Sequence, residues 1–225
     1  MMRRVVAFSA VLGAMLSASA CFGPEEVYTL PDAVTDFNAL FATNCAGCHG
    51  KDGRGGAARL LNDPLYQALV KKERMIDVIS KGVRGTAMPA FAKSAGGMLT
   101  DQQVGILAEE MQKRWAKPAE FGNVALPAYD GAPGDATRGE AAYRTFCASC
   151  HGPEGKGVIG KGGPVVDPAY LAQVSDQALR LAVIAGRPDL GAPDFRNDVP
   201  GRPMQPQEIA DVVAWLASHR ERKLP

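Results

Sequence analysis

The stretch CAGCH at residues 45–49 returns as CASCH at residues 147–151, and this doubled pattern decides how the chain folds. Each copy puts two thiols on one turn and a histidine directly after the second thiol. Such thiols can each add to one vinyl group of a haem, and the adjoining imidazole can then bind the iron. The sequence therefore predicts two covalently bound haem c groups. The residues expected to hold them are Cys45, Cys48, His49, Cys147, Cys150 and His151.

Other interpretations of a CxxC pair compete with haem attachment. A pair alone also fits a redox dithiol, half of a zinc site, or a disulfide in an exported protein. Neither zinc nor dithiol chemistry requires a histidine at the next position, yet it occurs there twice in a chain with only 5 Cys and 3 His. The sequence therefore favours haem attachment.

The amino terminus predicts export from the cytoplasm. Basic residues at positions 3 and 4 precede an uncharged, largely apolar stretch over 5–20, which is typical of a signal peptide spanning residues 1–20. This stretch is shorter than the roughly 20 residues of a membrane-spanning helix. Export agrees with covalent haem attachment, which takes place outside the cytoplasm.

Cys21 is the only cysteine outside the two motifs. The segment LSASAC over 16–21 resembles a bacterial lipoprotein signal, which implies that Cys21 is acylated and that residues 21–31 form a tether to the membrane surface. The alternatives are cleavage after Ala20, which would give a soluble periplasmic protein with a spare thiol, and an uncleaved helical anchor. The expected location is the periplasmic side of a bacterial membrane.

The rest of the sequence reads as a tandem duplication. Residues 63–66 (DPLY) align with 167–170 (DPAY), and residues 82–91 align with 186–195. We therefore expect a first domain over 32–117, a Pro/Gly-rich linker over 118–134 and a second domain over 135–225. Removing the signal peptide takes the formal net charge from +1 to −1, so no nucleic-acid partner is expected.

Helical patterns dominate both copies. Apolar residues recur at helical spacing before each motif and near each domain's end, and no run alternates as a strand would. Asp63 before Pro64 and Asp167 before Pro168 predict helix N-caps, and Thr100 with Gln103 predicts a capping box. The expected fold class is all-α.

A helix, the CxxCH motif, a glycine-rich turn, a loop and a closing helix together resemble class I cytochrome c. The resemblance covers both copies and implies two small helical bundles, each wrapped around one covalent haem c. It also implies a methionine ligand opposite the histidine. GTAMPAF over 85–91 is similar to the family's methionine loop, so Met88 is the expected sixth ligand of the first iron, ahead of Met98 and Met111.

The second copy departs from this pattern, because Ala192 aligns with Met88. Met204 is the only methionine in this half and is the leading candidate for the second iron's sixth ligand. Three alternatives stay open. Met204 could pack where Leu99 does, leaving the iron five-coordinate; an exogenous group could complete the iron; or His219 could bind it.

In the family, a backbone carbonyl also fixes the histidine ligand. The resemblance points to Pro164 in the second copy and to Leu60 or Leu61 in the first.

These features predict a dihaem cytochrome that carries single electrons between membrane-associated redox partners in respiratory or photosynthetic transport. The donor and acceptor would be redox proteins, within or outside a larger membrane complex. An alternative is a dihaem oxidoreductase or peroxidase-like enzyme with an open second iron. A ligand-sensing haem module is a third class. The sequence favours an electron carrier over a catalyst, since no acid/base cluster is evident beside Ala192.

Overall fold

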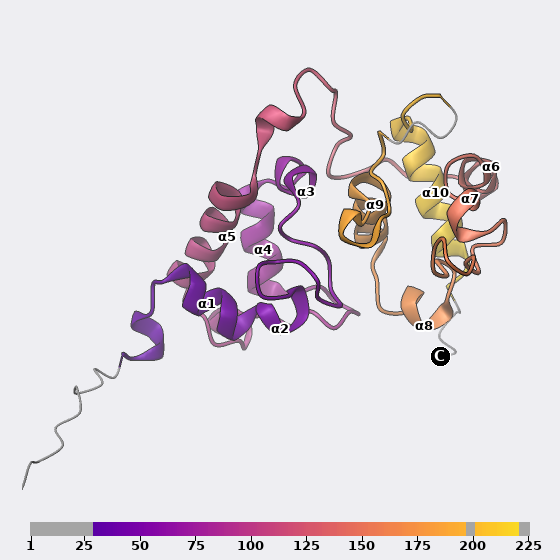
Figure 1. Cartoon of the computed structure of the whole chain (residues 1–225). Coiled ribbons are helices and arrows are strands. Elements are labelled where there is room, and N and C mark those ends of the chain that lie inside the picture. Colours follow the sequence, from indigo (N-terminus) through magenta and orange to yellow (C-terminus); the bar gives the residue numbers. More distant parts are fainter. Residues whose placement is uncertain (1–28, 197–200, 221–225) are drawn as a thin grey trace, which may run out of the picture.

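The computed structural model describes residues 29–196 and 201–220. Within these ranges the chain forms α-helices and short 3-10 turns, with isolated β-bridges and no strand, which confirms the all-α prediction. Figure 1 shows two helical halves side by side, joined by an extended segment. The predicted signal peptide, Cys21 and most of the predicted tether lie outside the described residues.

The first half follows the expected order of a helix, the motif turn and a closing helix (Figure 1). Its elements are η1 (Pro31–Ala33), α1 (Phe37–Asn44), α2 (Ala46–His49), α3 (Pro64–Leu69), α4 (Lys72–Lys81), η2 (Lys93–Ala95) and α5 (Asp101–Trp115).

The second half repeats this order after the linker, which contains η3 (Pro118–Glu120). Its elements are α6 (Ala136–Phe146), α7 (Ala148–His151), α8 (Pro168–Leu171), α9 (Asp176–Ala185), η4 (Pro188–Leu190) and α10 (Pro206–Ser218). None of the described helices combines the length and apolar character that crossing a membrane requires.

The predicted capping residues begin the helices as expected. The Asp63 carboxylate accepts a hydrogen bond from the Tyr66 amide, and Asp167 accepts one from Tyr170. Thr100 exchanges hydrogen bonds with Gln103 in a complete capping box. Each cap satisfies amide groups that the first helical turn leaves without a partner.

The helices that cross in the second half come into close backbone contact at Gly139 of α6. A Cβ added there would lie 2.0 Å from the carbonyl oxygen of Asp211 in α10, so only glycine allows this approach. In the first half, the corresponding helices α1 and α5 meet through aromatic rings. Phe37 and Phe41 of α1 meet the edge of Trp115 with centroids 5.9 and 5.5 Å apart.

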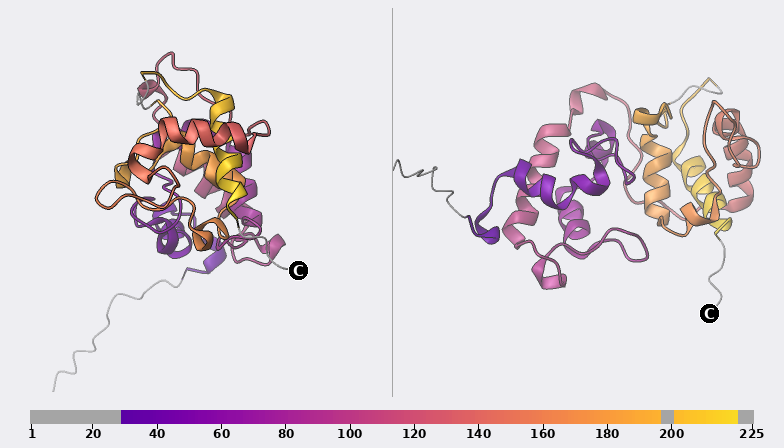
Figure 2. Two further views of the ribbon diagram at one scale, coloured as in Figure 1. Left: turned by 90° about the vertical axis from the view of Figure 1, so that its right-hand side faces the viewer. Right: turned by 60° about the horizontal axis from the view of Figure 1, so that its bottom comes forward.

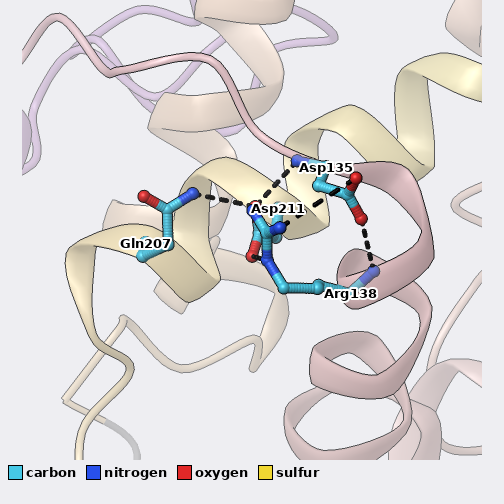
Figure 3. A network of polar contacts seen from close by, with 4 residues as sticks. All are labelled: Asp135, Arg138, Gln207 and Asp211. Carbon is cyan, nitrogen blue, oxygen red and sulfur yellow. Dashed lines mark hydrogen bonds and ion pairs between the residues drawn. The ribbon is translucent and has the colours of Figure 1, made fainter.

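A buried carboxylate also joins α6 to α10 (Figure 3). Asp211 accepts 2.8 and 2.9 Å hydrogen bonds from the Arg138 guanidinium. It also accepts from the Asp135 amide at 2.7 Å and from the Gln207 amide at 2.9 Å. These hydrogen bonds, that of Arg138 first, lower the pKa of Asp211 to about 2.

The linker packs against the second half. Arg180 of α9 is buried and donates to the carbonyl of Ala128 at 2.8 Å, while Gln177 donates to that of Tyr129 at 2.8 Å. Helix α9 also contacts α3 of the first half, and Figures 1 and 2 both show it between the first half and α10. The face of the second half that carries α9 is therefore the one that meets the first half.

Candidate haem sites

Both CxxCH motifs fold in the same way. Cys45 is the C-cap of α1 and the N-cap of the single turn α2, and Cys147 does the same between α6 and α7. In each turn the histidine amide donates to the carbonyl of the first cysteine at 3.0 Å. One turn therefore presents two thiols and an imidazole together.

The four thiols of the motifs are free. Burial, followed by the neighbouring Cys48, raises the pKa of Cys45 to about 11, and burial with Cys150 raises that of Cys147 to about 12. Reactive redox thiols instead have a lowered pKa, because the thiolate is the nucleophile. Cys45 and Cys147 therefore lack the lowered pKa that is typical of a redox nucleophile.

Backbone carbonyls hold both histidines in one orientation. The Nδ1 atom of His49 lies 2.7 Å from the carbonyl oxygen of Arg59, and that of His151 lies 2.7 Å from the carbonyl of Gly163. Since a carbonyl only accepts, Nδ1 carries the proton and Nε2 keeps its lone pair for a metal. Burial lowers the pKa of His49, which favours the neutral form that binds iron.

These carbonyls correct one expectation. The resemblance pointed to Pro164 and to Leu60 or Leu61, but the acceptors belong to the preceding residues, Gly163 and Arg59. The carbonyl of any residue type can serve here, so side-chain identity gave no signal.

Met88 lies in a loop that crosses over Gly82. A Cβ at Gly82 would stand 2.6 Å from the Met88 carbonyl oxygen, which accepts a hydrogen bond from the Val83 amide at 3.1 Å. Thr86 braces the loop, because its hydroxyl donates to the Val83 carbonyl and accepts from the Met88 amide. Met88 is half-buried. Met98 is 74% exposed and Met111 is buried in α5, as expected for a core residue.

The corresponding loop of the second half makes the same crossing over a glycine with a different side chain. A Cβ at Gly186 would lie 2.6 Å from the Ala192 carbonyl, which accepts from the Arg187 amide at 3.0 Å. Ala192 therefore occupies the structural position of Met88, as the sequence alignment predicted. Its methyl group offers no ligand to a metal.

Met204 occupies the position of Leu99. Its amide donates to the Phe195 carbonyl at 2.9 Å, just as the Leu99 amide donates to Phe91 at 2.8 Å. Both side chains are buried, and both directly precede the N-cap of a closing helix. Ligation of the second iron by Met204 stays a prediction, and this equivalence supports the alternative that Met204 packs in the core.

His219 is bound to its own helix. Its Nδ1 atom lies 2.8 Å from the Trp215 carbonyl, and its ring meets the indole edge at a centroid distance of 4.5 Å. It forms the C-cap of α10, in keeping with the expectation of a residue at a helix terminus.

The donor set of each half fits a covalent haem c: two free thiols on one turn and an imidazole whose Nδ1 faces a backbone carbonyl. Glycines let the chain pass close behind the turn. A Cβ at Gly56 would lie 2.2 Å from the Cys48 carbonyl, and one at Gly162 would lie 3.1 Å from Nδ1 of His151.

Comparison with known families agrees with this geometry. The family model described as cytochrome C oxidase, cbb3-type, subunit III matches residues 32–109, and the cytochrome c model matches residues 136–220. The chain is a c-type cytochrome with two cytochrome c domains. The cytochrome carries two covalently bound haem c groups, one in each domain.

Similar curated proteins are subunits of membrane complexes. The cytochrome is 29% identical over 169 residues to the cbb3-type cytochrome c oxidase subunit FixP of Sinorhizobium medicae (strain WSM419), covering 69% of this chain and 53% of that subunit. It is 26% identical over 196 residues to the cytochrome bc1 complex cytochrome c subunit of Corynebacterium diphtheriae (strain ATCC 700971 / NCTC 13129 / Biotype gravis), covering 81% and 65%. It is 32% identical over 135 residues to the cbb3-type subunit CcoP of Rubrivivax gelatinosus, covering 57% and 37%. The chain thus spans between about a third and two thirds of these relatives.

Proposed function

We propose that the cytochrome passes single electrons between redox partners at the periplasmic face of a bacterial membrane. A haem iron supplies a one-electron couple when bound. The two CxxCH turns, each with its histidine held by a backbone carbonyl, carry the proposal. The thiols proposed to attach the haems are those of Cys45, Cys48, Cys147 and Cys150, and the proximal ligands are His49 and His151.

The first domain is built to hold an iron with little rearrangement. Met88 is the proposed sixth ligand, in a loop fixed by Thr86 and by the close approach to Gly82. A thioether opposite an imidazole favours reduced iron and raises the potential. A braced loop keeps the ligand in place in both oxidation states.

Redox titration of the purified protein tests this role directly. We expect two haems per chain by alkaline pyridine absorbance and two one-electron steps, of which the one assigned to the first haem has the higher potential. Replacing His49 by Ala should shift only that step. A single haem per chain, or one potential that His49→Ala leaves unchanged, would contradict the proposal.

The proposed partners are a protein donor and acceptor, within a membrane electron-transport complex or beside one. Relatives that are subunits of cbb3 oxidases and bc1 complexes support a membrane-associated setting. We further propose attachment to the membrane surface through acylated Cys21. In membrane fractionation, Cys21→Ser should release the protein while retaining both haems; retention on the membrane would favour a helical anchor or a partner complex.

A second candidate function rests on Ala192 at the position of Met88. If Met204 also packs like Leu99, the distal side of the second haem carries no protein ligand from either position. Such an iron could bind small ligands and support oxidoreductase or peroxidase-like chemistry. Carbon monoxide added to the reduced protein separates the candidates: an absorbance change from one haem supports an open second iron, and no change at either haem excludes it.

A further inference from the structure

Arg59 contacts both domains of the cytochrome. Its backbone carbonyl accepts the Nδ1 proton of His49 at 2.7 Å, and its guanidinium donates to the carbonyl of Ala178 in α9 at 3.1 Å. The first contact lies inside the first haem site, and the second crosses to the other domain. One residue therefore spans the distance between a haem ligand and the domain interface.

The guanidinium of Arg59 also contacts an aromatic ring of the first domain. It lies over the ring of buried Tyr66, with 5.6 Å between its central carbon and the ring centroid. Arg59 is half-buried beside this ring, and burial lowers the pKa of its guanidinium. A hydrogen bond from a charged donor contributes more to stability than a hydrogen bond between neutral groups.

The second domain lacks such a connection. Its acceptor carbonyl belongs to Gly163, which has no side chain to reach another part of the molecule. The two histidines have the same 2.7 Å contact, yet only His49 is tied to a side chain that crosses the interface.

We propose that Arg59 is a positioning residue. It couples the docking of the second domain against the first, here called domain seating, to the orientation of His49, the histidine ligand of the first haem. A side chain anchored on α9 restrains the backbone dihedral angles of Arg59 and thus the direction of its carbonyl. That carbonyl sets the orientation and basicity of His49, and thereby the potential of the first iron. The inference rests on the proposed role of His49 as an iron ligand.

Coupling of this kind acts in both directions. If seating of α9 strengthens the hydrogen bond to His49, then a change at the first iron alters how firmly the second domain is seated. Gly163 transmits nothing of this sort to the second iron. The first haem alone would therefore respond to the arrangement of the domains.

The test compares Arg59→Ala and Arg59→Lys with Lys51→Ala, in the full-length dihaem protein. Lys51 is exposed and belongs to the same glycine-rich loop region, so its removal changes the net charge equally. Hydrogen exchange of the α9 amides reports domain seating. The hyperfine-shifted imidazole proton resonances of the two oxidised haems report each histidine ligand separately.

We expect Arg59→Ala to accelerate exchange in α9 by roughly ten- to a hundredfold, the range that corresponds to loss of one hydrogen bond from a charged donor. The histidine signals of the first haem should shift, and those of the second should stay unchanged. Arg59→Lys should give smaller changes of the same sign, because its ammonium can donate to the same carbonyl. Lys51→Ala should resemble the wild type.

Two results would overturn the coupling. One is faster exchange in α9 with unchanged signals from the first haem; the other is a shifted first haem with unchanged exchange. Arg59→Lys keeps the test valid if Arg59→Ala fails to fold. Haem content measured on every variant tests attachment separately, since two haems with no coupling would refute only this inference.

Discussion

The two domains share a scaffold and differ in the chemistry that the scaffold presents. The loops at Met88 and Ala192 cross Gly82 and Gly186 with the same 2.6 Å approach and the same amide-to-carbonyl hydrogen bond. The crossing over the glycine therefore does not depend on the methionine side chain. A duplicated domain can then lose a metal ligand at one side chain without losing its fold.

The largest effect is expected where the domains differ most in packing. Gly139→Val should destabilise the second domain by about 3 kcal/mol, because its branched side chain would overlap the Asp211 carbonyl and push α6 away from α10. Urea unfolding followed by the Soret signal of each haem measures this. Gly105→Val is the matched control, since a Cβ at Gly105 in α5 meets nothing within 4 Å. Equal stability of the two variants would show that the crossing is not tight.

Restoring the methionine should remove the main chemical difference between the domains. Ala192→Met places a thioether where the first domain has one, and we expect carbon monoxide affinity at the second haem to fall on the order of 100-fold. A tethered ligand competes at millimolar or higher effective concentration. The reduction potential of the second haem should also rise. Ala169→Met, at an exposed position of α8, should leave both properties unchanged. Carbon monoxide titration with no difference between these variants would contradict an open second iron.

The sequence predicted the parts of these sites that depend on residue type. Paired thiols, Met88, its replacement by Ala192 and the caps at Asp63 and Asp167 all carry their signal in a side chain, and the described structure places each cap and loop as expected.

What the sequence did not reveal depends on the backbone or on contacts between distant segments. The carbonyls of Arg59 and Gly163 leave no trace in residue identity. The contact from Arg59 to Ala178 requires knowing how the domains dock. Likewise, the equivalence of Met204 with Leu99 is visible only in the hydrogen bond from its amide to the Phe195 carbonyl. The number of residues between His151 and Met204 fits a longer ligand loop equally well.

A smaller effect on stability is expected from Asp211, which joins the closing helix α10 to α6. The lowered pKa of Asp211, about 2, means that its ionised form stabilises the second domain above pH 4, and that this contribution is lost as pH falls from 4 towards 2. Asp211→Asn should cost about 1 to 2 kcal/mol at pH 6, a range that allows for the exposure of Arg138.

Urea unfolding of the second domain between pH 6 and pH 2.5 measures this contribution, and the gap between wild type and Asp211→Asn should shrink with acid. Glu140→Gln is the control, since the Glu140 pair with Arg144 is exposed and should contribute little. A gap that stays constant with pH would mean that Asp211 is not ionised in the folded protein.

The smallest effect is expected at Met204, where the domains should be most alike. If Met204 packs as Leu99 does, then Met204→Leu should cost less than about 1.5 kcal/mol, because the two side chains have similar volume. The oxidised absorption spectrum, including the methionine-to-iron charge-transfer band, should not change. Met88→Leu is the matched comparison, and it should abolish that band. Loss of part of the band in Met204→Leu would place Met204 on the second iron and would make the domains alike in ligand set while different in the loop that supplies it.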